Sequence, residues 1–353
     1  MTTTNFLPGH TLYVISGIGG MTGFELTKQI IASNTNYHII GFDNLFNCDA
    51  KKISNLCSHN RNIILQLGLE WSIENIHCMQ SIYNDVFNMI KNYQDIINVV
   101  YVNCAAVVHT KHFYHPSDTF DVNVEGMRMF LEQILALTTI VKERNINFEF
   151  INCSTSEVYS AQSWKPGGVK ENDILSIYTV EHSMRTSYAI GKLMTEMFAK
   201  EAFENHKLKT CSVRFANVYT EDELQPEHII PYIINEFNRG NEVHLLENAK
   251  ETQRTFLHNH DSASAVLTLI ANPSALDGSV YNVGTTEEVF IKDLALRIGK
   301  LMNIENPRIL FDRPARKADP KRRMLNVDKL KALGWNPQVT LDDGLRRCCH
   351  VMS

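Results

Sequence analysis

Short apolar runs alternate with longer amphipathic stretches through the first two-thirds of the chain. The apolar runs cover residues 11–15, 37–42, 97–103, 148–153 and 210–215, and we expect each to form a buried strand. A first helix is expected over residues 23–33, directly after a glycine-rich turn. Strands that are almost entirely apolar and separated by helices are typical of a sheet buried on both faces. The pattern therefore predicts an α/β fold with a doubly wound parallel sheet.

The pattern changes near residue 217. Prolines at positions 226, 231, 273, 307, 314, 320 and 337 interrupt shorter elements, and residues 313–323 form a basic stretch. Frequent prolines between short elements predict a second, smaller domain that is partly interleaved in sequence with the domain of the parallel sheet. We expect one domain to comprise residues 1–217 and 252–282, and a smaller C-terminal substrate-binding domain to comprise residues 218–251 and 283–353.

Composition and charge exclude several functional classes. The chain has 353 residues, 44% hydrophobic and 21% charged, which is ordinary for a globular protein with a large core. A net charge of -5 gives no basis for nucleic-acid binding. No apolar run approaches the roughly 20 residues of a membrane span, and we expect no secretory signal.

Cysteine and histidine usage bears on the compartment and on metal binding. The eight cysteines include no CxxC pair, and several lie in apolar runs, where a free thiol behaves as a small hydrophobic side chain. We therefore expect a reducing, cytoplasmic compartment and no disulfide framework. His109, His112 and His115 are spaced at intervals of three but are followed at once by Pro116. The segment is expected to be a loop, and no metal site is predicted.

A glycine-rich turn links the first predicted strand to the first helix. Residues 16–23, Ser-Gly-Ile-Gly-Gly-Met-Thr-Gly, place Gly17, Gly20 and Gly23 in a G-x-x-G-x-x-G pattern. These glycines permit a tight turn and a close approach of the backbone to a pyrophosphate on the helix N-terminus. Asp43 ends the second predicted strand, where a carboxylate accepts hydrogen bonds from a ribose 2′-hydroxyl and repels a 2′-phosphate. Together they predict a Rossmann-like domain that binds NAD, although a turn without ligand and a turn-forming aspartate remain alternatives.

Tyr188 lies four residues before Lys192 in the sequence Tyr-Ala-Ile-Gly-Lys. On a helix this spacing puts both side chains on one face. We hypothesise that the ammonium lowers the pKa of the phenol from its ordinary value of about 10, as proton transfer beside a hydride acceptor requires. The alternative is an amphipathic helix surface.

With the glycine turn, Asp43 and the pair Tyr188 and Lys192 in this order, the chain resembles the extended short-chain dehydrogenase/reductases. Within them it is similar to the NAD-dependent nucleotide-sugar epimerase/dehydratase family. Further short segments support this resemblance over nearly the whole chain. They are residues 104–106, 120–126, 214–219, 254–261, 281–284 and 333–337. Residues 163–185 form a longer stretch than is typical and are expected to be a flap near the substrate.

The resemblance implies which residues contact each ligand. NAD is expected to contact Gly17, Gly20, Met21, Thr22, Gly23, Asp43, Asn44, Ala105, Ala106, Asn123, Tyr188 and Lys192. A nucleotide-diphosphate sugar is expected to contact His109, Asn217, Arg254 and Arg322. The resemblance also implies a homodimer formed through helices near residues 123–137 and 188–203, whose apolar residues suit a core equally well.

The resemblance further implies a shared first step. Tyr188, assisted by Lys192 and by Thr155 at the end of the preceding strand, takes the proton of the sugar C4 hydroxyl, and NAD accepts the C4 hydride. The resulting ketone acidifies the neighbouring C5–H bond.

Glu157 and Ser156 bear on the outcome of the reaction. The resemblance implies that Glu157 abstracts the C5 proton and that Ser156 helps water to leave, so a 4,6-dehydratase, a lyase, is favoured. Epimerisation by an isomerase and UDP-glucuronate-type decarboxylation stay open, and Glu157 is alternatively a carboxylate bonded to the backbone at a strand end. More distant alternatives are a simple NAD-dependent alcohol or steroid dehydrogenase and a non-catalytic dinucleotide-binding protein.

Overall fold

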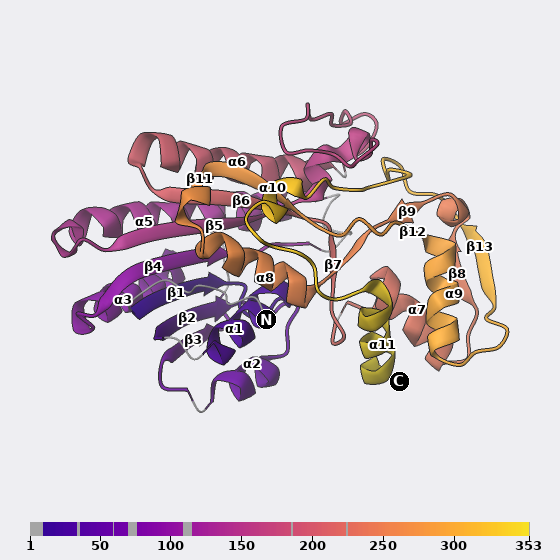
Figure 1. The fold of residues 1–353 in the computed structure, drawn as a ribbon, viewed down its shortest axis with the longest axis horizontal. Coiled ribbons are helices and arrows are strands. Elements are labelled where there is room, and N and C mark those ends of the chain that lie inside the picture. Colours follow the sequence, from indigo (N-terminus) through magenta and orange to yellow (C-terminus); the bar gives the residue numbers. More distant parts are fainter. Residues whose placement is uncertain are drawn as a thin grey trace.

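A seven-stranded parallel sheet forms the centre of the protein in the computed structural model (Figure 1). The structure describes residues 10–33, 36–58, 60–69, 76–108, 115–184, 186–223 and 225–352. The strands are β1 His10–Ser16, β2 Tyr37–Asp43, β3 Ile63–Leu67, β4 Ile96–Asn103, β5 Asn147–Thr155, β6 Lys209–Phe215 and β11 Asp277–Val283. Their order is β11-β6-β5-β4-β1-β2-β3, so the direction of winding reverses between β1 and β4. The predicted fold class, Rossmann-like and doubly wound, is confirmed.

Helices cover both faces of this sheet (Figure 1). One face carries α1 Met21–Ala32, α2 Ala50–Cys57, α8 Asn259–Ile270 and α10 Asp328–Lys331, and the other carries α3 Ile76–Asn92, α5 Met127–Ile140 and α6 Thr186–His206. Successive side chains of a strand point to opposite faces. Tyr13 and Ile15 therefore belong to the core under α1 and α8, whereas Leu12 and Val14 belong to the core under α3, α5 and α6. This explains why the strands are apolar throughout.

A third hydrophobic core lies in a smaller unit beyond the sheet (Figure 1). Its helices are α7 Ile229–Asn238, α9 Ile291–Leu301 and α11 Leu341–Met352. Its strand pairs are β7 Asn217–Tyr219 with β10 Phe256–His258, β8 Val243–Leu246 with β13 Ile309–Arg313, and β9 Gln253–Arg254 with β12 Val289–Phe290. Leu325, Leu330 and Trp335, which the expected boundaries assign to the smaller domain, pack instead in the core of the sheet. The domain division therefore stays a prediction.

The strands predicted from apolar runs are all present, and their ends differ by at most two residues from those expected. The apolar pattern does not predict β3 and β11. The side chains of β3 are only partly buried, and β11 begins with Asp277, Gly278 and Ser279, none of which has an apolar side chain. The expected helix over residues 123–137 is divided into a π-helical segment, Phe120–Gly126, and α5. No helix in the described part of the chain has the length and apolar character needed to span a bilayer.

Candidate functional site

A cavity of about 1120 Å³ opens at the carboxyl ends of the central strands. Doubly wound sheets bind ligands at this edge, next to the point where the strand order reverses. The predicted site residues that line the cavity are Gly17, Gly20, Met21, Thr22, Gly23, Asp43, Asn44, Ala105, Ala106, Thr155, Glu157, Tyr188, Lys192, Asn217 and Arg254. Asn123, Ser156 and Arg322 do not line it, and His109 lies outside the described residues.

The turn between β1 and α1 has no room for side chains at two of its glycines. Gly17 has a positive φ of 64°, and a Cβ there would lie 2.7 Å from the backbone nitrogen of Ala105. A Cβ at Gly23 would lie 2.3 Å from the carbonyl oxygen of Gly17. Helix α1 begins at Met21 without a side-chain cap, and its first turn lines the cavity. The amide groups and positive end of this helix fit the pyrophosphate of a dinucleotide.

Asp43 connects this turn to the end of β2. Its Oδ2 accepts a hydrogen bond from the backbone of Gly19 at 2.9 Å, and its Oδ1 accepts one from the backbone of Leu45 at 2.9 Å. Its Oδ1 also accepts a hydrogen bond from Cys48 Sγ at 3.3 Å. An ionised carboxylate has about four acceptor positions, so about one remains for a ribose hydroxyl. The carboxylate and the uncapped helix end together fit NAD, the adenosine ribose at Asp43 and the pyrophosphate at α1.

Asn123 lies behind the cavity wall and contacts the backbone of the loop that forms it. Its side chain accepts a hydrogen bond from the backbone nitrogen of Val107 at 2.8 Å and donates one to the Val107 carbonyl at 3.2 Å. Val107 directly follows Ala105 and Ala106, which line the cavity. The expectation that Asn123 itself contacts NAD is corrected accordingly, because the π-helical segment buries this side chain against the loop that contacts the cavity.

Tyr188 and Lys192 both reach the cavity from α6, and both are buried. Lys192 Nζ donates to the carbonyl oxygen of Cys153 at 2.8 Å, and burial lowers the Lys192 pKa to about 8. The pKa of Tyr188 is raised by burial and by the charge of Glu157, and a hydrogen bond with Thr155 only partly opposes the rise. In this structure the pKa of the phenol is thus raised rather than lowered, because removing the phenolate from water outweighs the opposing interactions.

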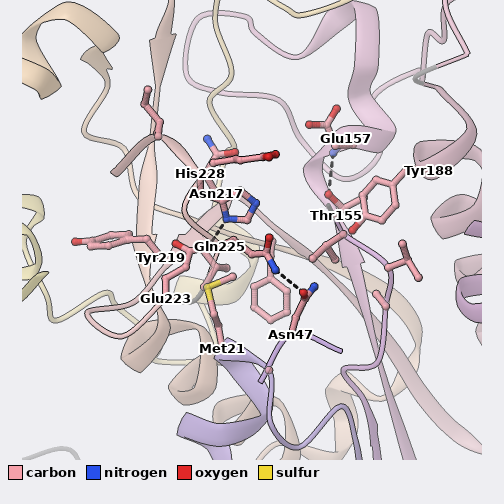
Figure 2. Close-up of a pocket in the computed structure, with 18 of the residues that line it drawn as sticks. Met21, Asn47, Thr155, Glu157, Tyr188, Asn217, Tyr219, Glu223, Gln225 and His228 are labelled. Carbon is pink, nitrogen blue, oxygen red and sulfur yellow. Dashed lines mark hydrogen bonds and ion pairs between the residues drawn. The ribbon is translucent and has the colours of Figure 1, made fainter. Parts of the chain in front are cut away.

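Glu157 follows β5 and lies near Thr155 and Tyr188 (Figure 2). Its Oε1 forms an ion pair with Nη1 of Arg323 at 2.7 Å. Arg323 is only 3% exposed, and its Nε and Nη2 are buried without a hydrogen-bond partner among the described residues. Ser156 is buried and does not line the cavity, so the structure does not bring it to the reaction centre.

The cavity wall also contains arginines that already have anionic partners. Arg254 Nη2 donates to Oδ1 of Asp319 at 2.8 Å, and Asn217 Nδ2 donates to the carbonyl of Thr255 at 3.1 Å. Arg322 points elsewhere: its guanidinium lies 3.8 Å from the Trp164 ring centroid and pairs with Glu288. The prediction that Arg322 meets the substrate is corrected, because the next residue, Arg323, lines the cavity in its place.

Several lining residues are not predicted from the sequence. Arg316 lies in the basic stretch already noted, and the loop before α7 contributes Glu223, Gln225 and His228. His228 contacts Glu223, and Gln225 donates a hydrogen bond to Asn47, so this loop meets the loop after β2 across the cavity (Figure 2). The basic composition of residues 313–323 was the available signal for Arg316 and Arg323. Only the path of the chain shows which of its arginines face the cavity.

A buried polar network lies behind the cavity wall formed by the end of β5 and by α6. Glu196 on α6 and Arg214 on β6 form an ion pair at 2.6 Å. Glu196 also accepts a hydrogen bond from Ser154 at 2.5 Å, directly before Thr155. Arg214 Nη1 donates to the hydroxyl of Tyr159 at 2.8 Å. The network therefore holds the end of β5 against α6, the helix that carries Tyr188 and Lys192.

The flap expected over residues 163–185 does not reach the cavity within its described part, residues 163–184. Instead, Ser163 and Val169 form backbone hydrogen bonds with Met324. The segment thus packs against the chain next to Arg323, and the carbonyl of Glu171 accepts a hydrogen bond from Arg214 of the buried network at 3.3 Å.

The chain is similar to known proteins over most of its length. A model of the NAD dependent epimerase/dehydratase family matches residues 13–284. A trifunctional UDP-glucose 4,6-dehydratase/UDP-4-keto-6-deoxy-D-glucose 3,5-epimerase/UDP-4-keto-L-rhamnose-reductase of Arabidopsis thaliana is 26% identical over 339 residues, 95% of this chain and 46% of that protein. The chain thus spans about half the length of this relative. A dTDP-D-glucose 4,6-dehydratase of Homo sapiens is 24% identical over 343 residues, 95% of this chain and 87% of that protein.

A solved structure shares the fold. The UDP-glucose 4-epimerase of Thermotoga maritima, solved with UDP-glucose, has a TM-score of 0.75 and is 22% identical. The match covers 96% of this chain and 98% of that one.

Proposed function

Since this chain belongs to the NAD-dependent epimerase/dehydratase family, we propose that it is a nucleotide-sugar 4,6-dehydratase. It would oxidise the sugar at C4 transiently and then eliminate water across C5 and C6. The observation that carries this proposal is the position of Glu157, a carboxylate that lines the cavity beside Thr155 and Tyr188. An epimerase that only turns a ketosugar over needs no carboxylate at this place.

The cofactor-side residues support this chemistry. The first turn of α1 and Asp43 would hold NAD, which supplies a hydride acceptor when bound. Tyr188 and Thr155 form a hydrogen-bonded pair through which the proton of a sugar hydroxyl is passed on. Lys192 carries a positive charge on the same helix face as Tyr188 and is held in place by the Cys153 carbonyl.

Glu157 is proposed as the base that removes the C5 proton. The guanidinium of Arg323, 2.7 Å away, stabilises the ionised carboxylate, which is the form that accepts a proton. A ketone at C4 makes the adjacent C5 proton acidic, so a carboxylate in this position suffices as a base.

The substrate diphosphate is proposed to lie between Arg254, Arg316 and Asn217, which all line the cavity. Guanidinium groups pair with phosphate oxygens in a fork-like geometry. Asp319, bonded to Arg254, orients that guanidinium before substrate arrives.

Arg323 favours a second candidate, decarboxylation of a nucleotide-linked uronic acid. Its Nε and Nη2 lack partners among the described residues, and a substrate carboxylate is a suitable acceptor for both. In that reaction carbon dioxide leaves from C5 after oxidation at C4, and Glu157 serves to orient Arg323 rather than to remove a proton.

Incubation with a panel of nucleotide sugars, followed by mass spectrometry, tests these candidates. Loss of water supports the dehydratase, loss of carbon dioxide supports the decarboxylase, and an unchanged mass with inverted stereochemistry supports an epimerase. Turnover of a free alcohol or steroid with net NAD reduction would contradict all three.

Glu157→Gln makes this test specific, since it keeps the size of the side chain and an acceptor for Arg323. For a dehydratase we expect loss of water elimination by about 10²- to 10⁴-fold, the range for a missing general base, with C4 oxidation retained and reduced nicotinamide accumulating. Unchanged NAD affinity serves as the folding control. Full dehydration by this variant would remove Glu157 from the mechanism.

We also propose that the protein is a homodimer. Ile190, Met194 and Met197 are 43%, 40% and 54% exposed and form one apolar stripe on α6. Such a stripe suits burial against a second copy. Light scattering that gives the mass of a single chain at micromolar concentration would contradict this assembly.

A further inference from the structure

Two cysteines lie side by side in the wall of the cavity. Cys104 follows β4 and Cys153 lies in β5, and both line the cavity. Their sulfur atoms are 3.6 Å apart, and neither is part of a disulfide. None of the steps proposed for the sugar chemistry uses either thiol.

The sheet places these residues at a separation that suits a disulfide. Asn103 is paired with Asn152 in parallel register, so the next residues of both strands are also neighbours. Adjacent strands lie about 4.8 Å apart, within the Cα separation of about 4.4–6.8 Å found across disulfides. The register and the 3.6 Å between the sulfurs are therefore compatible with a disulfide.

The cavity gives a reagent access to the pair. Cys104 is only partly buried, and the pair lies beside Lys192, whose Nζ is bonded to the carbonyl of Cys153. The hydrogen bond to Cys153 and burial both raise the pKa of Cys104, while the ammonium of Lys192 opposes the rise. Cys104 consequently stays protonated near neutral pH, and its reaction is slow compared with that of an exposed thiol. The short distance between the two sulfurs, and not a lowered thiol pKa, distinguishes this pair from the other cysteines.

We infer that Cys104 and Cys153 form a dithiol modification site that hydroperoxides oxidise to a disulfide, and that bound NAD shields it. With hydrogen peroxide, one sulfur attacks an oxygen, the O–O bond breaks, and a sulfenic acid and one water form, whereas an organic hydroperoxide releases an alcohol in place of this water. The second thiol then displaces the hydroxyl as a second water, so two S–H bonds are replaced by one S–S bond. The inference depends on the cavity and the cofactor, not on which sugar the enzyme uses.

The first experiment treats the cofactor-free protein with hydrogen peroxide and maps peptides without reduction. We expect a cross-link between Cys104 and Cys153 that dithiothreitol reverses. Cys104→Ser and Cys153→Ser should each abolish it, whereas Cys57→Ser, which removes a buried thiol of α2 away from the cavity, should leave it intact. Oxidation of other cysteines while these two stay reduced would overturn the inference.

The second experiment measures shielding. With NAD at about ten times its Kd, mass action leaves about one molecule in eleven free, so cross-linking should slow about tenfold. Phenylarsine oxide, which binds two neighbouring thiols, should label the wild-type protein and neither serine variant. An unchanged cross-linking rate with NAD present, or equal arsenical labelling of the serine variants, would contradict a dithiol site in the cofactor cavity.

Discussion

The cofactor side of the cavity, where we propose that NAD binds, and the substrate side, where we propose that the diphosphate binds, are built in different ways. On the cofactor side, the glycine turn, Asp43 and Ala105 lie directly at the ends of β1, β2 and β4, and their main contacts involve backbone groups. On the substrate side, Arg254 pairs with Asp319 and Arg323 pairs with Glu157, residues 65 and 166 positions apart. The first side depends on strand ends, and the second depends on charges brought together from distant segments.

The difference reflects two physical problems. The first backbone N–H groups of any helix lack partners within the helix and can bind a pyrophosphate. The glycines therefore only have to let the phosphates approach the backbone closely. A buried guanidinium instead requires an anionic partner, because removal of an unpaired charge from water is costly. Arg254 and Arg323 are both buried, and each has such a partner.

We expect the largest loss of activity from a change at Tyr188, which lies between the cofactor side and the substrate side. Tyr188→Phe removes the phenolic hydroxyl that meets Thr155. We expect kcat to fall by about 10²- to 10⁴-fold, the range for a lost proton-transfer group. Isothermal titration should show NAD affinity nearly unchanged. Retained activity would show that the proton leaves by another route.

On the substrate side, Arg254→Ala should weaken substrate binding and spare NAD binding. Hydrogen bonds to charged groups are worth about 1.5–3 kcal/mol, so KM is expected to rise roughly 10- to 100-fold. Asp319→Asn is the matched control, since it keeps Arg254 but loosens its orientation, and it should have a smaller effect. If Asp319→Asn raises KM as much as Arg254→Ala does, the aspartate itself contacts the substrate.

On the cofactor side, Asp43→Asn should weaken NAD binding and spare substrate binding. It keeps an acceptor for the backbone of Gly19 or Leu45 but loses the charge that we propose contacts the ribose. We expect NAD affinity to fall about tenfold, with a relative gain for NADP, because one charge-assisted interaction is worth about 1.5 kcal/mol. Binding titrations with both dinucleotides measure this. Unchanged selectivity would place the ribose elsewhere.

The smallest expected effect concerns Lys192 and stability. Burial lowers its pKa to about 8 in the fold, below its value of about 10.4 in an unfolded chain. Between these values the unfolded chain binds more protons, so this group makes the free energy of unfolding rise with pH. The rise amounts to about 1 kcal/mol from pH 8 to 9 and should be absent in Lys192→Met. Urea titrations of the cofactor-free proteins give the difference, and parallel pH curves would contradict the depressed pKa.

Much of the cofactor side could be predicted from residue order. Apolar runs mark the strands, and the polar or small residues that follow each run must meet at one edge of a parallel sheet. Asn123 shows the limit of this reasoning, since its π-helical segment turns the side chain toward Val107 and not into the cavity. Ser156 shows it as well, because one residue after Thr155 the chain bends into a 3-10 helix and buries the hydroxyl.

The sequence by itself determined five strands of the sheet, the glycine turn, Asp43 and the pair on α6, because each depends on periodicity or on spacing within one element. The tertiary structure alone decided that Arg323 rather than Arg322 meets Glu157, that Arg254 meets Asp319, and that two cysteine sulfurs lie 3.6 Å apart. It also decided the pKa direction of Tyr188, which depends on burial as well as on neighbouring charge. These are properties of pairs from distant segments, and only the packing of strands, helices and loops brings such pairs into contact.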